Sequence, residues 1–281
     1  EIAISESQER MAVVIAPEDF ETFKRLADAE NLETTQVATV TDSGRLIMHW
    51  RGKPIVSLSR EFLNTNGVQS EIEVALACPK ESENFFLQDK PYAKAKADIE
   101  QAFLANLGEL HSASQKGLVE QFDSTVGAGT VLLPFGGKTQ QTPALGMAAK
   151  LPVLEGETHT ASLMAYGYNP KIAKWSPYHG ALYAVVDAVA KIVAMGGNPQ
   201  GIRLSLQEYF EKLNQEPYRW GKPFAALLGA FEAQMELAAP AIGGKDSMSG
   251  SFKDMHVPPT LAAFAVATVA DWRRILSPEF K

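Results

Sequence analysis

Residues 242–250, with the sequence IGGKDSMSG, combine side chains that bind phosphate and metal ions within one short stretch. Glycines allow backbone N–H groups to approach a ligand closely. Lys245 can pair with a phosphate, and Asp246 can hold Mg2+. The hydroxyls of Ser247 and Ser249 can bond to either partner. The stretch is not a Walker A loop, because Gly-x-x-x-x-Gly-Lys-Ser/Thr does not occur in the chain, so a phosphate loop and an ordinary polar turn both stay open.

Two other regions offer carboxylates to a metal ion. Residues 155–162 place Glu155, a second carboxylate, three hydroxyls and an imidazole within eight residues. Such a set suits Mg2+ and phosphate rather than zinc, although a solvated loop is the alternative. Asp187 lies in an apolar segment, where a carboxylate is costly unless it is paired or bound to a cation. Lys191 follows four residues later, so an ion pair along a helix is the other interpretation.

Composition excludes several classes of function. The chain of 281 residues is 46% apolar and 21% charged, as soluble globular proteins are. Its net charge of −7 argues against a nucleic-acid-binding protein. No apolar run approaches the roughly 20 residues that span a bilayer, and no signal peptide is recognisable, so we expect a cytoplasmic protein and no membrane partner. Cys78 is the only cysteine, which excludes an internal disulfide and a multi-cysteine metal site.

Hydrophobic patterning predicts two domains joined by a linker. In residues 1–80 we expect a helix opening at Pro17 and strands at 11–16, 33–40, 45–50 and 54–58, with a turn at 42–44 between the second and third strands. The charged, alanine-rich residues 81–116 indicate a helical linker, with its helix over 92–107. A second domain follows over 117–271, and residues 272–281 begin a connection to whatever comes next.

All the candidate ligands named above fall in the second domain. Its expected helices cover 178–194 and 224–238, and its expected strands cover 122–133, 202–206 and 261–269. Helices alternating with strands in this way indicate an α+β fold, in which helices pack on mixed sheets. The stretch 242–250 would connect the second helix to the last strand.

Six motifs, in this order, resemble phosphoribosylformylglycinamidine synthase, the purine-pathway amidotransferase, in its large single-chain form. They are SESQERM at 5–11, FLNTNG at 62–67, THTAS at 158–162, WSPYHGA at 175–181, QEYF at 207–210 and GGKDSMS at 243–249. The match runs along almost the whole chain. Each motif alone is weak, but six motifs in the family's order make the match specific.

The resemblance implies two domains like those of aminoimidazole ribonucleotide synthetase. Residues 1–80 would be a C-terminal domain from the first half of the synthetase core. Residues 117–271 would be the N-terminal, nucleotide-binding domain of the second half. The resemblance also implies that Glu6, Ser7 and Gln8 contact formylglycinamide ribonucleotide.

In the second domain the resemblance implies a site for ATP or ADP with Mg2+. It implies that Lys245, Ser247 and Ser249 serve the nucleotide. Asp246 is then the best candidate for a metal ligand. The motif that carries these residues is the one whose side chains already suit phosphate and Mg2+.

The resemblance extends the metal set to two further acids. Glu155 falls where the family has an acidic Mg2+ ligand, and Asp187 falls where the family commonly has a glutamate. Four residues beyond that glutamate the family often carries an asparagine ligand, whereas this chain has Lys191. A lysine at this position would repel Mg2+ or replace its charge.

The activity implied for the whole enzyme is that of a ligase. ATP phosphorylates the amide oxygen of formylglycinamide ribonucleotide, and ammonia from glutamine displaces the phosphate to give the amidine. The family's catalytic histidine and its glutaminase residues are expected elsewhere in a longer parent chain, so no catalytic residue is assigned here. We expect this chain to be inactive alone. A structural nucleotide-binding module and a domain-assembly module stay open as alternatives.

Overall fold

The computed structural model describes residues 10–65, 71–88, 98–122 and 124–278. By its contacts the chain divides into two compact units, Glu1–Ser70 and Glu71–Lys281, and each is described by itself. The boundary lies ahead of the one expected at residue 80, because residues 71–88 pack onto the second unit.

The first unit contains one hairpin and a few short helices. Its elements are η2 Pro17–Asp19, α1 Phe20–Ala29, β1 Arg45–Trp50, β2 Lys53–Ser59 and α2 Arg60–Leu63. β1 and β2 pair antiparallel around Arg51 and Gly52, whose φ angles are 51° and 75°. Two adjacent residues with positive φ favour a tight turn that matches the twist of the flanking strands. The predicted helix at Pro17 and the strands at 45–50 and 54–58 are confirmed.

Two other strands predicted for this unit are wrong. Residues 11–16 and 33–40 form no strand, and the turn at 42–44 leads into β1 instead of joining two strands. Val14 is 83% exposed and Val37 is 87% exposed. A strand needs a neighbour to pair its backbone groups, and only β1 and β2 pair within the described part of this unit. The two apolar segments therefore form no strand, because no partner pairs with them in the described part of this unit.

The second unit is built on a six-stranded mixed sheet in the order β3-β6-β7-β12-β8-β9. The strands are β3 Thr130–Leu132, β6 Met147–Lys150, β7 Ala161–Gly167, β12 Thr260–Val269, β8 Arg203–Tyr209 and β9 Ala241–Lys245. Every neighbouring pair is antiparallel except β8 and β9, which run parallel at one edge. The predicted strands at 202–206 and 261–269 are confirmed as β8 and β12.

Short elements surround this sheet. They are η5 Leu110–Ser112, α4 Lys116–Val119, η6 Val126–Ala128, β4 Phe135–Gly136, β5 Thr142–Pro143, η7 Pro199–Gly201, β10 Ser251–Phe252, β11 Met255–His256 and η8 Trp272–Arg274. β4 pairs with β5, and β10 pairs with β11. Of the strand predicted over 122–133, only β3 forms, after the glycine-containing turn η6.

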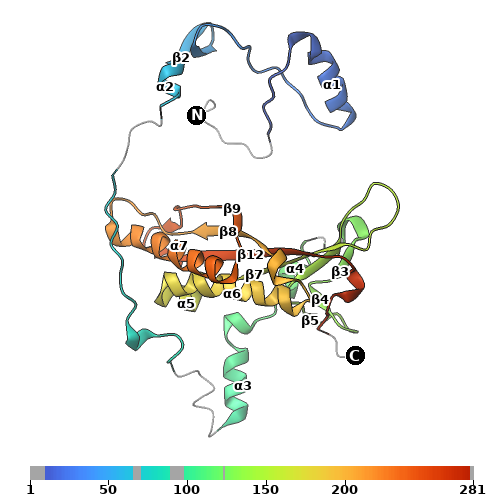
Figure 1. The fold of residues 1–281 in the computed structure, drawn as a ribbon. Helices are drawn as coiled ribbons and strands as arrows, with labels where there is room; N and C mark the ends of the chain where they lie inside the picture. Colours follow the sequence, from blue (N-terminus) through green and yellow to red (C-terminus); the bar gives the residue numbers. More distant parts are fainter. Residues whose placement is uncertain (1–9, 66–70, 89–97, 123, 279–281) are drawn as a thin grey trace. The chain divides into compact units, whose positions relative to one another are not determined.

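Helices cover one face of the sheet, and the core lies between the two layers (Figure 1). They are α5 Pro170–Trp175, α6 Pro177–Ala194 and α7 Pro217–Leu237. α6 packs on β7 and β12, and α7 packs beside α6. Gly167 permits this closeness, because a Cβ there would lie 2.0 Å from the carbonyl oxygen of Ala184. Leu163 and Val185 are fully buried in the resulting core.

The two long helices are close to prediction. α6 begins at Pro177 and ends at Ala194, one residue earlier than expected at its start. α7 begins seven residues ahead of the predicted start at 224, with Pro217 in its first turn and Pro223 inside the helix. Proline usually ends a helical pattern because it lacks an N–H group, which is why the early part of α7 was missed.

Residues 71–88 form a segment, here called the strap, that contacts α7 and α5. Near its start the backbone N–H of Ala75 donates to the carbonyl oxygen of Pro217 at 3.1 Å. Further on, Trp175 Nε1 donates to the carbonyl oxygen of Lys80 at 3.0 Å. These bonds attach the strap to α7 and α5.

The predicted linker helix is present only in part. η3 covers Glu81–Glu83 within the strap. α3 lies after the strap and covers Ile99–Leu107, with Asp98 as its N-cap. The rest of the predicted helix falls in 92–97, which lies outside the described residues. Among the described helices, none is both long and apolar enough to cross a membrane.

Candidate functional site

Residues 242–250 are divided between a strand and a loop. Residues 241–245 form β9, the edge strand parallel to β8, and only residues 246–250 form a loop. A Cβ on Gly244 would lie 2.2 Å from the carbonyl oxygen of Leu206. This glycine is therefore explained by the close approach of two strands. The expectation of a polar loop or turn over the whole of 242–250 is corrected accordingly.

The loop 246–250 is held by the backbone of the residues that continue β8. Ser247 N donates to the carbonyl oxygen of Glu208 at 3.1 Å, and Phe210 N donates to the carbonyl oxygen of Ser247 at 2.9 Å. Gly250 N then donates to the carbonyl oxygen of Phe210 at 2.9 Å. The loop is thus fixed along its length, and its side chains project from a defined backbone.

The polar side chains of this region lie close together. Lys245 Nζ donates to the backbone carbonyl of Asp246 at 2.9 Å, and the Oγ atoms of Ser247 and Ser249 are 2.8 Å apart. Lys245 and Asp246 are exposed. The structure therefore brings together all four residues predicted in this motif, with a cation, a carboxylate and two hydroxyls accessible from solvent.

Glu208 is a buried carboxylate beside this loop. β8 and β9 pair Gln207 with Lys245, so the same parallel register places Glu208 next to Asp246. Glu208 is only 6% exposed, and no residue in the described ranges forms a hydrogen bond or ion pair with its carboxylate. Burial, and then the negative charge of Asp246, raise the pKa of Glu208 to about 7.

The sequence contained a signal for this residue that was not used. Leu204, Leu206 and Glu208 alternate along β8, so all three side chains point to the helix-covered face. A carboxylate in the inward register of a strand is costly to bury, which marks it as unusual. We assigned the segment around it only to a family motif.

A second buried carboxylate, Glu211, lies three residues further along and has several partners. Glu211 is 5% exposed, and its carboxylate forms an ion pair with Lys222 from α7. Arg219 Nε and His256 Nδ1 each lie 3.6 Å from it. Glu211 therefore ties the hairpin β10–β11 to the beginning of α7.

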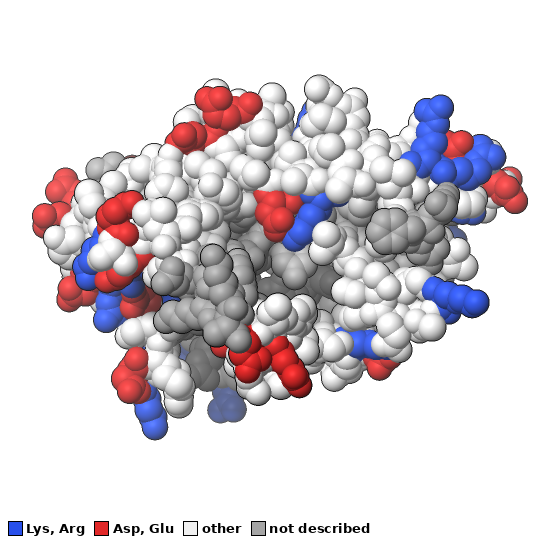
Figure 2. Space-filling model, turned by 90° about the horizontal axis from the view of Figure 1, so that it is seen from below, with Lys and Arg blue, Asp and Glu red and all other residues white. Residues whose placement is uncertain are grey.

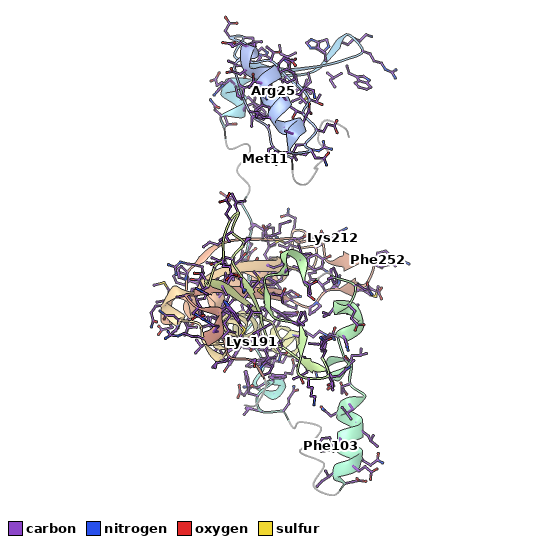
Figure 3. The ribbon with its side chains drawn as sticks, turned by 90° about the vertical axis from the view of Figure 1, so that its right-hand side faces the viewer. Met11, Arg25, Phe103, Lys191, Lys212 and Phe252 are labelled. Atoms are coloured by element: carbon purple, nitrogen blue, oxygen red, sulfur yellow. The ribbon has the colours of Figure 1, made fainter. Side chains whose placement is uncertain are left out.

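The hairpin is attached at a second point. Lys212 N donates to Ser251 Oγ at 3.0 Å, and Ser251 Oγ lies 2.8 Å from His256 Nδ1. In Figure 3, Lys212 and Phe252 lie on the same side of the second unit, whereas Lys191 lies apart from them. The loop and the hairpin thus form one region at the end of β8.

The other predicted metal ligands lie elsewhere. Glu155 is exposed in the loop between β6 and β7. Asp187 on α6 pairs with Lys191 at 2.7 Å, and Lys191 Nζ also donates to the carbonyl oxygen of Tyr166 at 2.8 Å. The ion pair that was left open for Asp187 is therefore present. Within the described ranges, no three His, Cys, Asp or Glu residues gather into a potential metal site.

Two other motifs contribute structure or cannot be described. In WSPYHGA, the buried Ser176 caps α6 by accepting from His179 N at 3.3 Å, and the ring of His179 stacks on Trp175 with centroids 4.8 Å apart. These contacts explain the motif as a helix start. Glu6, Ser7 and Gln8, the predicted substrate contacts, lie outside the described residues.

Two shallow grooves flank the loop. One, of about 410 Å³, is lined by Ser205, Leu206, Gln207, Ile242, Gly243, Gly244, Lys245 and Phe264. The other, of about 380 Å³, is lined by Tyr209, Ser249, Gly250, Ser251, Phe252, Met255, His256 and Val257. On the face drawn in Figure 2, basic and acidic side chains are interspersed and separated by uncharged surface.

Comparisons with known proteins agree with the motif match. The family model "AIR synthase related protein, C-terminal domain" matches residues 1–51. Phosphoribosylformylglycinamidine synthase subunit PurL of Thermoplasma volcanium is 26% identical over 289 residues, which cover 100% of this chain and 35% of that protein. The structure of T. maritima PurL complexed with ATP aligns with a TM-score of 0.67 at 19% identity, over 99% of this chain and 40% of that one.

A further structure, T. maritima PurL complexed with FGAR, aligns with a TM-score of 0.68 at 20% identity and covers 99% of this chain and 39% of that one. The α+β fold and the resemblance to phosphoribosylformylglycinamidine synthase are confirmed. The chain spans only about 35% of the length of the curated relatives it matches. Over nearly its whole length, this chain is therefore similar to about one third of phosphoribosylformylglycinamidine synthase subunit PurL, and it has the fold of that part of PurL.

Proposed function

We propose that this chain is part of a cytoplasmic phosphoribosylformylglycinamidine synthase. That ligase converts formylglycinamide ribonucleotide to its amidine with ATP and glutamine. The observation that carries the proposal is similarity over the full chain to PurL, joined to a polar loop fixed at the parallel β8–β9 edge. Related PurL structures bind ATP, ADP, AMPPCP and FGAR, which supports nucleotide and substrate as ligands.

Within the second unit, the loop and the end of β9 would bind a nucleotide phosphate. Lys245 would supply positive charge, and Ser247 and Ser249 would donate hydroxyl hydrogen bonds. Asp246 fits Mg2+, because its exposed carboxylate lies among oxygen-rich groups that suit this ion. When bound, Mg2+ would neutralise phosphate charge.

Asp187 and Glu155 have a weaker structural case as metal ligands. Lys191 already satisfies Asp187 with its own positive charge. Glu155 is exposed on the loop between β6 and β7, and among the described residues it belongs to no group of three His, Cys, Asp or Glu side chains. We therefore centre the metal site on Asp246 alone from the predicted set.

In the first unit, we propose that Glu6, Ser7 and Gln8 contact formylglycinamide ribonucleotide. This part of the proposal is supported by the motif match and by the family model over residues 1–51. The remaining domains of the parent chain, including the glutaminase that supplies ammonia, would complete the enzyme.

Calorimetric titration of the 281-residue chain with ADP and Mg2+ tests the nucleotide role. Lys245→Ala should weaken ADP binding by about tenfold or more, because a charge-assisted contact to phosphate is lost. Lys253→Ala is the matched control, since it removes the same charge from the exposed turn between β10 and β11. Equal affinity in wild type and Lys245→Ala would contradict the proposed site. Turnover of formylglycinamide ribonucleotide with ammonia by this chain alone would contradict its assignment as an incomplete part.

A structural nucleotide role is the second candidate. It is favoured by the Asp187–Lys191 pair, which withdraws one predicted carboxylate from metal chemistry. Asp246→Ala in the full-length enzyme separates the two roles. Lost turnover in a folded enzyme favours catalysis, whereas lost folding with normal turnover per folded molecule favours structure.

A further inference from the structure

Glu208 differs from Glu211, the other buried acid among the described residues, in lacking a side-chain partner. It is 6% exposed, yet no residue in the described part of the chain bonds to its carboxylate. Burying a carboxylate without a partner is costly, so such groups usually pair or coordinate a cation. The Glu208 oxygens keep some contact with solvent, so water or a bound cation can reach them.

The geometry directs this carboxylate towards Asp246. The pairing of Gln207 with Lys245 is followed by the bond from Ser247 N to the carbonyl oxygen of Glu208, at 3.1 Å. These two contacts bracket Asp246 and hold it beside Glu208. Lys245 Nζ donates to the Asp246 backbone carbonyl and forms no ion pair with the carboxylate of Glu208 or Asp246.

We propose that Glu208 and Asp246 together bind a divalent cation of the Mg2+ or Mn2+ class. Mg2+ sites in proteins commonly use one or two carboxylates and complete the shell with water and phosphate oxygens. Glu208 would be the inner, buried ligand and Asp246 the outer one. The inference deepens the proposed nucleotide function and rests on it for the phosphate oxygens, but the carboxylate pair can be tested with the metal alone.

The test titrates the 281-residue chain with Mn2+ and reads free Mn2+ by electron paramagnetic resonance. Glu208→Gln should weaken Mn2+ binding by about tenfold or more, because it removes a ligand while keeping the side-chain shape. Asp246→Asn should give a similar loss, because it removes the second ligand, in the loop that follows β9. Asp254→Asn, which removes the same charge from the exposed β10–β11 turn, should change affinity by less than about twofold.

The outcomes separate this inference from the nucleotide proposal. Unchanged Mn2+ binding in a folded Glu208→Gln chain overturns the inference, as does an equal loss in Asp254→Asn. If Glu208→Gln does not fold by circular dichroism, Asp246→Asn decides, and unchanged binding there overturns it. Titration with ADP is the second measurement. If Mn2+ binding depends on Glu208 but ADP does not bind, the result supports the carboxylate pair as a cation site and contradicts the nucleotide role.

Discussion

Glu208 and Glu211 are two buried carboxylates three residues apart, and their surroundings differ in charge. Glu208 faces the loop 246–250 and has no partner among the described side chains, whereas Glu211 faces the hairpin β10–β11 and meets Lys222, Arg219 and His256. Both residues are at most 6% exposed. Burial alone therefore does not distinguish an anchor from a candidate ligand site. The presence or absence of compensating charge does.

Removing the anchor should have the largest effect. Glu211→Gln deletes the charge that pairs with Lys222 and Arg219, and we expect the free energy of unfolding to fall by about 2–4 kcal/mol. The partners are each partly exposed, which keeps the effect below that of a fully enclosed pair. Urea denaturation of the variant measures it. A change below about 0.5 kcal/mol would show that Glu211 is no anchor.

The unpartnered carboxylate should behave in the opposite sense at high pH. The folded-state pKa of Glu208, about 7, lies above its ordinary value of 4.5, so folding favours the protonated form. Its contribution to stability is fully present below about pH 4.5 and is lost as pH rises through 7. Without metal, Glu208→Gln should stabilise the chain by about 1–3 kcal/mol at pH 8 and by almost nothing at pH 4.

Urea denaturation at both pH values checks this, with Asp254→Asn as an exposed carboxylate control. The control should shift stability equally at both pH values. A Glu208→Gln chain that keeps the full pH dependence of the wild type would show that another group is responsible.

Substitution of Ser251 measures how much its hydroxyl, compared with the Glu211 carboxylate, contributes to attaching the hairpin β10–β11. Its Oγ accepts from Lys212 N and lies 2.8 Å from His256 Nδ1. Ser251→Ala should lower the free energy of unfolding by about 1 kcal/mol, because one hydrogen-bond acceptor is lost. Hydrogen exchange at Lys212 N should speed up in parallel. If stability falls as far as in Glu211→Gln, the hydroxyl rather than the carboxylate would be the main attachment.

The smallest effect is expected for the carboxylate that lies on a helix surface. Asp187→Asn breaks the ion pair with Lys191. The side chain of Asp187 is 48% exposed and that of Lys191 is 19% exposed. Such pairs along a helix contribute about 0.3–0.5 kcal/mol. Thermal denaturation with and without 1 M NaCl measures it, and salt should remove most of the difference. A loss above about 2 kcal/mol would place Asp187 with the buried acids instead.

Long periodic segments were predictable because their own pattern identifies them. α6 and β12 each bury one face, and the spacing of their apolar residues along the sequence predicts this burial. The strands predicted at 11–16 and 33–40 failed for a complementary reason. Strand formation depends on a partner from another part of the chain, which local alternation does not specify.

Some features of the candidate site were likewise predictable from the sequence, whereas others depend on the tertiary structure. Residue type and sequence spacing determined three things. The order of the motifs gave the family resemblance, the alternation of helices and strands gave the α+β class, and one short motif already holds Lys245, Asp246 and the two serines together. Only the tertiary structure placed Glu208 beside Asp246 and gave Glu211 its cations. It also showed Asp187 paired with Lys191. Partnership between charges depends on distance and burial, and a linear sequence encodes neither until strands and helices pack.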